Sequence, residues 1–256
     1  MIKSGRKNFC YCIAVFFAIC FVCGCQKTQS EDYQLIVDHF KEMVIQQDED
    51  SAAFDQVLET TGVYIKDSTE DHLKEAREAV QKQIDAFSEE SESYEVMEMD
   101  DDFLKLLDEY GIDAAEYKVV AEMGNVELSS YIDSLTVLKY YLDAETEGDL
   151  LRETLEFIYE QDVAIQEYTR RFYFCQINYF FAEWDEELTA YVKDTIMTDL
   201  KSFWFDDMKW ETDKKTIEDK AMIYTNQIAE ELDKLMDDIG RHQEELYQME
   251  KEAVIE

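Results

Sequence analysis

The chain has 256 residues and a formal net charge of −37, because 61 Asp and Glu residues face only 24 Lys and Arg residues. An electrostatic field of that sign repels nucleic acids and anionic lipid surfaces, which proteins bind chiefly through Lys and Arg. Hydrophobic residues make up 46% of the chain and aromatic residues 13%, enough to form a core. The composition therefore argues against a disordered chain and against a nucleic-acid-binding protein.

Residues that form turns are scarce. The chain contains no proline and seven glycines, two of them within the first 24 residues. Strand hairpins and βα loops depend on these residues, so their scarcity argues against sandwiches, barrels and the two-lobed α/β solute-binding fold. Apolar residues instead recur at steps of three and four, which predicts an all-α fold, a bundle of several long amphipathic helices without a sheet.

The first 24 residues have the pattern of an export signal. Lys3, Arg6 and Lys7 precede an uncharged apolar run from Phe9 to Val22. This run is shorter than the roughly 20 residues that cross a bilayer as a helix, which favours a cleaved export signal over a spanning anchor. An uncleaved anchor and an ordinary secretory signal are the alternatives.

The end of this segment resembles the lipobox of bacterial lipoproteins. Val22 is the apolar residue three positions before Cys25, and Gly24 is the small residue just before it. Cys23 stands where the family more often has Ala, Ser or Thr. The resemblance implies that a diacylglyceryl group is attached to the Cys25 sulfur and that the chain is cleaved before Cys25. Two acyl chains such as palmitate, at about 0.8 kcal/mol per buried CH₂, would hold the protein on the extracytoplasmic face of the cell membrane.

Composition and periodicity divide the chain into five parts. These are a signal peptide at 1–24, a tether at 25–30, N-terminal helices at 31–87, an acidic loop at 88–102 and a main helical bundle at 103–256. The acidic loop separates two amphipathic stretches and lacks their periodicity. Its aspartates do not have the spacing of an EF-hand calcium loop.

Helix caps and breakers predict the limits of the helices. Within 31–87 we expect three helices: one to residue 47, one over 52–61 that begins at Ser51 and ends at Gly62, and one that begins at Ser68 or Thr69. In the main bundle, Gly111 ends a short helix, Asp113 begins the next, and Gly124 with Asn125 interrupts it. Further helices are expected over 128–148, 150–183, 185–204 and from Asp213 to the end. Residues 205–212 form a connector.

The helix over 150–183 is expected to be the central one. Residues 172–181 are apolar or aromatic on nearly every side, as in a helix with several neighbours. Cys175 is then a buried, unreactive thiol, with a reactive thiol as the alternative. Arg170 and Arg171 are expected to form structural ion pairs, or alternatively to bind a ligand.

The terminal segment has an apolar seam of heptad type, from Ile217 to Met249. Packing within the chain, as a monomer, is the expected use of this seam. A dimer formed through residues 214–250 is the alternative.

The sequence gives little sign of catalytic chemistry. His39, His72 and His242 do not occur in a nucleophile motif, and no glycine-rich phosphate loop is present. Each His has a Glu three residues later, but Glu is so frequent that the spacing is weak support for a metal site. We therefore expect no catalytic residue, no metal and no cofactor.

The expected function is non-enzymatic: a membrane-tethered interaction or scaffold protein that presents an acidic helical surface to a protein or peptide. The alternative is a binding module that sequesters a cationic ligand, a basic peptide or a metal ion, at the cell surface. A concave cluster of exposed aromatic residues with an acidic rim would favour the peptide-binding alternative. His and Glu brought together from different helices would favour a metal.

Overall fold

The computed structural model describes the backbone of residues 5–96, 101–144, 149–184, 186–197, 205 and 207–253. It describes the side chains of residues 32–91, 102–144, 149–184, 186–196, 205, 207–242 and 244. Across these residues the regular secondary structure is entirely helical and no strand is present, which confirms the predicted all-α bundle. No helix in the described part of the chain combines the length and apolar character needed to span a bilayer.

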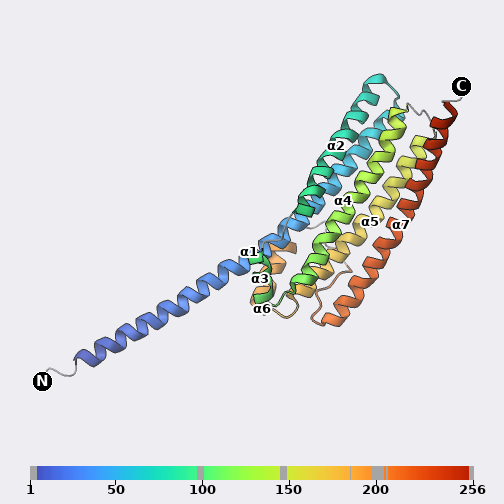
Figure 1. Cartoon of the computed structure of the whole chain (residues 1–256). Helices are drawn as coiled ribbons and strands as arrows, with labels where there is room; N and C mark the ends of the chain where they lie inside the picture. The colour runs from blue at the N-terminus through green and yellow to red at the C-terminus, as the bar shows by residue number, and fades with distance from the viewer. Residues whose placement is uncertain are drawn as a thin grey trace.

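Five long helices build the bundle, and successive ones run in opposite directions (Figure 1). They are α1 (Gly5–Lys66), α2 (Glu70–Val96), α4 (Ala114–Asp143), α5 (Asp149–Phe181) and α7 (Lys214–Ala253). The N-terminal part of α1 extends away from the other helices. The α5 helix packs against α1, α4 and α7, so the helix expected to be central does have several neighbours.

Three short elements complete the fold. They are α3 (Asp101–Glu109), α6 (Glu186–Val192) and the π-helical segment η1 (Lys193–Met197). The α3 and α6 helices lie near the end of the bundle from which α1 extends (Figure 1). Of the helix expected over 185–204, residues 186–197 are helical, and residues 198–204 lie outside the described residues.

Several helix limits follow the predicted caps. The Thr69 hydroxyl accepts a hydrogen bond from the backbone of the first turn of α2 at 3.2 Å. The Asp113 carboxylate accepts two such bonds, at 2.7 and 3.3 Å, at the start of α4. Asp213 accepts one at 3.2 Å at the start of α7. Gly111, with a φ of +76°, follows α3 in the left-handed conformation that favours glycine. These local signals are confirmed.

The predicted break at Ser51 and the predicted stop at Gly62 are wrong, because α1 runs through both residues to Lys66. Ser51 is buried and its hydroxyl bonds the Tyr131 hydroxyl at 3.2 Å, so its side chain has a tertiary partner instead of a capping role. A glycine inside a helix costs only about 1 kcal/mol relative to alanine. Burial of Phe54 and Leu58 within the same segment outweighs that cost.

The predicted interruption at Gly124 and Asn125 is also wrong, because α4 continues through both. A Cβ on Gly124 would lie 3.4 Å from the Tyr173 hydroxyl, so glycine admits the close approach of this ring from α5. Asn125 accepts a hydrogen bond from Ser91 of α2 at 2.6 Å. Both residues therefore serve helix packing.

The acidic segment 88–102 is largely helical, which corrects the predicted loop. Residues 88–96 continue α2, residues 101 and 102 begin α3, and residues 97–100 lie outside the described residues. The segment follows buried Phe87, and Ser91 ties it to α4. Contacts with the neighbouring helices thus stabilise a stretch whose sequence has little periodicity.

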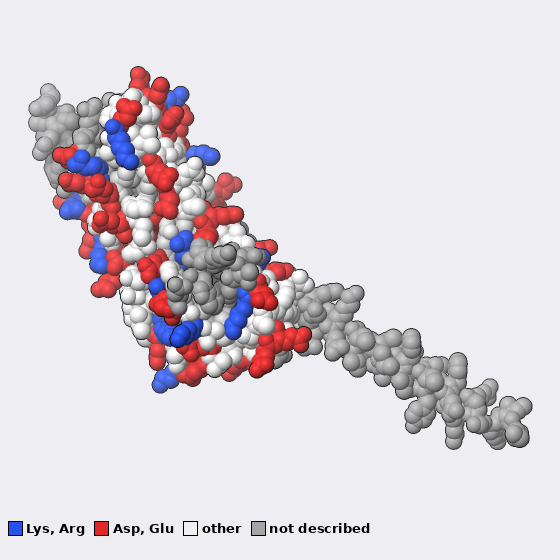
Figure 2. Space-filling view, turned by 180° about the vertical axis from the view of Figure 1, so that it is seen from behind, with Lys and Arg blue, Asp and Glu red and all other residues white. Residues whose placement is uncertain are grey.

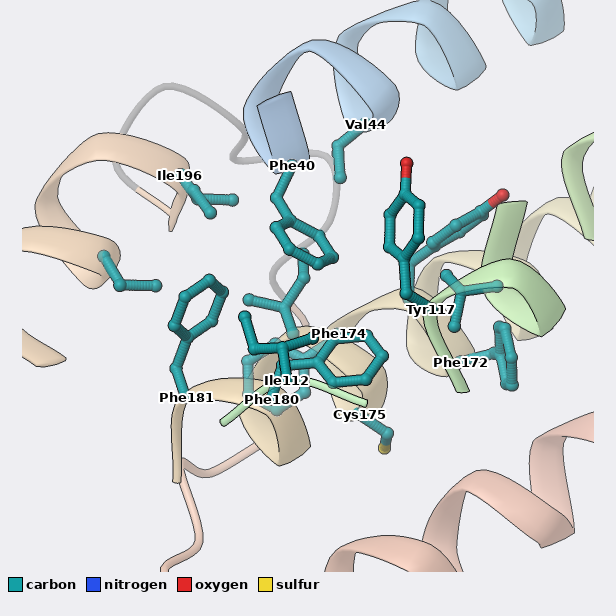
Figure 3. Close-up of a cluster of buried hydrophobic side chains, with 14 of the residues drawn as sticks. Phe40, Val44, Ile112, Tyr117, Phe172, Phe174, Cys175, Phe180, Phe181 and Ile196 are labelled. Carbon is teal, nitrogen blue, oxygen red and sulfur yellow. The ribbon is translucent and has the colours of Figure 1, made fainter. Parts of the chain in front are cut away.

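The core consists of two clusters that both include residues of α1. In the first, Figure 3 shows Phe40 of α1 beside the aromatic residues of α5, with ring centroids 5.4 Å from those of Phe180 and Phe181. In the second, the Phe54 ring stacks on the Tyr131 ring at 4.3 Å. The predicted seam of α4 is buried here: Leu128, Tyr131, Leu135, Leu138 and Leu142. Residues of 31–87 and of 103–256 therefore share the same core clusters.

The C-terminal seam packs inside the chain as far as its side chains are described. Ile217, Ile228, Leu235 and Ile239 of α7 are buried, and α7 packs on α5. The later seam residues, Leu246 and Met249, lie outside the described side chains. The dimer through residues 214–250 stays a prediction.

Candidate functional site

The predicted lipid-attachment residues lie in α1, but only their backbone is described. Val22, Cys23, Gly24 and Cys25 fall in the helical range, and their side chains lie outside the described ones. The same holds for the predicted tether, residues 25–30. The lipid anchor stays a prediction.

Arg170 and Arg171 form ion pairs with acids of α1, of α5 itself and of the segment before α7. The Arg170 guanidinium donates to the Asp48 carboxylate of α1 at 2.9 Å. Arg171 donates to Glu167 at 3.1 Å and to Asp207 at 2.9 Å, and its guanidinium lies 4.1 Å from the centroid of the Phe205 ring. These contacts favour the structural interpretation over the ligand-binding one.

Cys175 is buried in the first core cluster, as expected. Burial raises the pKa of its thiol to about 11, because the thiolate loses its hydration there. At neutral pH the side chain is therefore a thiol and not the nucleophilic thiolate.

The three histidines lie in three different places. His39 forms a short hydrogen bond with the Tyr117 hydroxyl, and burial lowers its pKa. His72 contacts the Asp67 carbonyl oxygen at 2.9 Å in the turn between α1 and α2. His242 bonds Tyr141 through Nδ1 and approaches Asp238 at 3.1 Å through Nε2. Within the described residues, no three His, Cys, Asp or Glu side chains are grouped so that they could hold a metal ion.

A cleft of about 850 Å³ lies between α1, α3 and α4, with one residue of α5 in its wall. Its apolar wall includes Leu35, Met43, Phe103, Leu106 and Leu128. The Leu35 side chain is 55% exposed, although leucine is usually buried. The full lining is Asp32, Leu35, His39, Glu42, Met43, Gln46, Gln47, Asp50, Asp102, Phe103, Leu106, Tyr117, Ala121, Glu122, Gly124, Asn125, Glu127, Leu128, Tyr131 and Tyr173.

The charged side chains that line this cleft are all acidic, and Lys105, which pairs with Asp102 at 2.9 Å, lies outside the lining. Six of its lining residues are acidic and none is Lys or Arg. The six are Asp32, Glu42, Asp50, Asp102, Glu122 and Glu127. An apolar cleft surrounded by carboxylates attracts cations and disfavours anions, because the low-dielectric wall strengthens the field of the charges.

Glu127 is the most buried of these acids and lies in a polar network that links α1 to α4. Its side chain is 5% exposed. Gln47 of α1 donates to both carboxylate oxygens at 3.2 Å, and the Tyr131 hydroxyl donates to one of them at 2.9 Å. Since Tyr131 gives its proton to Glu127, Ser51 donates to the Tyr131 oxygen. The network fixes the carboxylate at the wall of the cleft.

Burial raises the pKa of Glu127 to about 7, although the hydrogen bonds from Tyr131 and Gln47 oppose this shift. A second acid of the cleft, Asp50, is hydrogen-bonded to Glu90 of α2. Burial and the charge of Asp50 raise the pKa of Glu90 to about 7. A protonated Glu90 can therefore donate to Asp50 near neutral pH, which removes one negative charge from the pair.

Another acidic pair lies between α1 and α5 and does not line the cleft. Burial raises the pKa of Asp162 to about 9, and the neighbouring charge of Asp55 adds to the shift. Gln166 donates to Asp162 at 2.8 Å. A protonated Asp162 can donate to Asp55, so this pair holds α1 to α5 in a form that carries one charge instead of two.

The sequence did not single out the residues of the cleft. Acids occur at about a quarter of all positions, so no pair of them stood out. One available signal was a polar residue placed beside an apolar seam: Glu127 directly precedes Leu128 and lies four residues before Tyr131. That spacing puts Glu127 and Tyr131 on the same face of the helix.

Acidic side chains also cover much of the outside. Figure 2 shows Asp and Glu distributed over the visible face, with Lys and Arg between them. Such a surface keeps a protein soluble and does not by itself mark a site. The cleft differs from it, because six acids and no Lys or Arg belong to its lining, and of these six only Asp102 has a lysine partner within 4 Å among the ion pairs of the described residues, Lys105.

The chain was compared with models of known protein families, with curated proteins and with solved structures, and none of the three comparisons found a match.

Proposed function

We propose that this chain is a lipid-anchored, extracytoplasmic protein that captures a cationic ligand in the cleft between α1 and α4. One observation carries the proposal: the cleft has six acidic residues and no Lys or Arg in its lining. The acidic rim is the one expected of a binding module, and the aromatic residues in the lining, Phe103, Tyr117, Tyr131 and Tyr173, are buried or half-buried and not exposed. The protein would act by binding, without catalysis.

The size of the cleft suits a small molecule or a few side chains of a peptide. Its volume of about 850 Å³ falls within the range of roughly 300 to 1,000 Å³ typical of ligand sites. The net charge of −37 would increase the rate at which a cation reaches the cleft.

The residues of the cleft support binding better than reaction. They supply carboxylates, amides and aromatic rings. The imidazole of His39 also lines the cleft, but it bonds Tyr117 and its lowered pKa leaves it neutral. None of the lining residues is a serine or a cysteine, the usual nucleophiles of hydrolases.

The experiment compares two probes of similar shape and opposite charge on the full-length protein. We expect 2-phenylethylammonium to bind and 3-phenylpropionate not to bind, as measured by isothermal titration calorimetry. Replacing three acids of the cleft together (Asp32→Asn, Glu42→Gln and Glu122→Gln) should weaken cation binding by about tenfold, because several tenths of a kcal/mol are lost per exposed charge. Added salt should also weaken it.

The matched control removes the same charge elsewhere. Glu153, Glu160 and Asp233 are exposed and do not line the cleft. The variant Glu153→Gln, Glu160→Gln and Asp233→Asn should bind the cation nearly as the unaltered protein does. Equal weakening in both triple variants, or no binding of the cation, would overturn the proposed site.

The anchor is tested separately. We expect the full-length protein, expressed in a bacterium that processes lipoproteins, to partition with the membrane fraction. The variant Cys25→Ala should lose this partitioning, because the acyl chains that would hold the protein have no attachment site. Membrane partitioning that persists in Cys25→Ala would show that the lipid assignment is wrong.

The acidic exterior supports a second candidate, a scaffold that presents its helical surface to another protein or peptide. The observation in favour is the spread of acids over the face in Figure 2. This candidate predicts a protein partner whose binding is weakened by the triple variant at Glu153, Glu160 and Asp233. The triple variant of the cleft, at Asp32, Glu42 and Glu122, should bind this partner as the unaltered protein does.

A further inference from the structure

We infer that the ligand of the cleft carries a primary ammonium group on an apolar body, and that the ammonium is recognised by Glu127 and Gln47. This inference rests on the proposed function and narrows it to one chemical class. It depends on the hydrogen bonds that the two side chains make and on those that they lack.

Gln47 is the first part of the argument. Its side chain lines the cleft and the residue is 5% exposed. The amide nitrogen donates to Glu127, which turns the amide oxygen away from the carboxylate. That oxygen is buried and has no hydrogen-bond partner among the described residues. A buried acceptor without a donor costs about 1 to 3 kcal/mol, so a ligand that brings an N–H group to it gains affinity.

Glu127 supplies the charge that such a donor needs. Its carboxylate accepts from Gln47 and Tyr131, and a carboxylate has about four acceptor positions. Capacity for one more donor therefore remains. Glu127 and the Gln47 oxygen together match a group with a positive charge and more than one N–H donor.

Three kinds of cation can be compared by how well they would bond the Glu127 carboxylate and the Gln47 oxygen. A primary ammonium has three N–H donors and can bond both acceptors at once. A quaternary ammonium has none and would leave the Gln47 oxygen without a partner. A divalent metal requires several oxygen or nitrogen ligands, and the described residues contain no suitable group of three His, Cys, Asp or Glu side chains.

The apolar residues in the wall of the cleft indicate that the rest of the ligand is apolar. Leu35, Met43, Phe103 and Leu106 lie along α1 and α3. Burying apolar surface against them would contribute roughly 25 cal/mol per Å². Phe103 and Tyr173 also line the cleft, and aromatic rings attract a cation that lies over their faces. An aryl or alkyl amine, or a lysine beside an apolar residue in a peptide, has this chemistry.

The test compares 2-phenylethylammonium with its N,N,N-trimethyl analogue on the full-length protein by isothermal titration calorimetry. We expect the primary ammonium to bind at least about tenfold more tightly, which is the usual effect of a charged hydrogen bond. The variant Gln47→Met should remove this preference by weakening the primary ammonium about tenfold and leaving the trimethyl analogue nearly unchanged. Glu127→Gln, which keeps the shape of the side chain, should weaken both cations.

Gln46→Met is the matched control. Gln46 also lines the cleft, but its amide donates to Asp50 and not to Glu127. Its replacement should preserve the preference for the primary ammonium. Circular dichroism and thermal unfolding confirm that each variant is folded before its binding is compared.

The outcomes separate this inference from the proposed function. If both cations bind equally and the cleft triple variant weakens both, the cleft binds cations but the ammonium assignment is wrong. If neither cation binds, the proposed function itself fails. A preference that survives in Gln47→Met would also overturn the role of Gln47.

A further arm distinguishes the two sources of a primary ammonium. A capped tripeptide of phenylalanine, lysine and leucine is compared with 2-phenylethylammonium. Tighter binding of the peptide that is lost in Glu127→Gln would identify a basic peptide as the source. Tighter binding of the amine would identify a free small amine.

Discussion

Replacing Asp162 with asparagine is expected to raise the free energy of unfolding at pH 7 by roughly 2 to 4 kcal/mol, because asparagine is neutral in both the folded and the unfolded chain. In the folded protein the pKa of Asp162 is about 9, so the side chain keeps its proton at pH 7. In the unfolded chain it ionises near its ordinary value of 3.8. Folding must therefore take up a proton, and asparagine removes that cost.

Asparagine also preserves the contacts of the pair. Its amide can donate to Asp55, as the protonated carboxyl does, and its oxygen can accept from Gln166. The exposed variant Asp233→Asn is the control and should change the stability by less than about 0.5 kcal/mol. Both variants are measured by urea unfolding followed by circular dichroism.

The gain in unfolding free energy from Asp162→Asn should depend on pH. A carboxyl with a raised pKa contributes its full stability below the unfolded pKa, and the contribution falls as pH rises toward the folded pKa. For Asp162 that interval runs from about 4 to about 9. The advantage of Asp162→Asn should therefore grow from pH 5 to pH 9. An advantage that is constant over this interval would contradict the protonated state of Asp162.

Phe181→Ala is expected to destabilise the protein by about 3 to 5 kcal/mol, the usual cost of truncating a buried aromatic residue. The Phe181 side chain is fully buried in the first core cluster. Its ring centroid lies 5.4 Å from that of Phe40 and 4.5 Å from that of Trp184. The truncation would leave a cavity where α1, α5 and the segment after α5 meet, and urea unfolding measures the loss.

Tyr159→Ala is the matched control, because Tyr159 lies on the same helix and is 51% exposed. Its truncation should cost about 1 kcal/mol or less. Similar losses in the two variants would show that Phe181 does not lie in the core. A variant Phe181→Ala that is unfolded without denaturant would still agree with the expected direction.

Periodicity and capping residues identified much of the fold correctly. The seam from Leu128 to Leu142 is buried because residues at steps of three and four share one face of a helix. Asp113 and Asp213 begin helices because their carboxylates accept the first free backbone N–H groups. These effects act within one or two turns of helix, so the sequence alone shows them.

The wrong predictions all placed breaks inside continuous helices. Ser51, Gly62, Gly124 and the acidic segment 88–96 carry local signals for caps, turns or loops. Each such signal is worth about 1 kcal/mol, and packing against a neighbouring helix can exceed that amount. Ser51 bonds Tyr131 across the bundle, and Gly124 admits the Tyr173 ring, but the sequence does not show which helix lies opposite.

Composition and periodicity were enough to predict an acidic, all-α chain, and a short motif was enough to suggest a lipid anchor, because these features are properties of residues that are close in the sequence. Which of the 61 acids are buried or paired with another carboxyl depends on the packing of the helices. Glu127 meets Gln47 from 80 positions away, and Asp162 meets Asp55 on another helix. Contacts between residues so far apart in the sequence form only when the helices pack, and this packing creates the cleft and raises the pKa of Glu90 and of Asp162 beside their acidic partners.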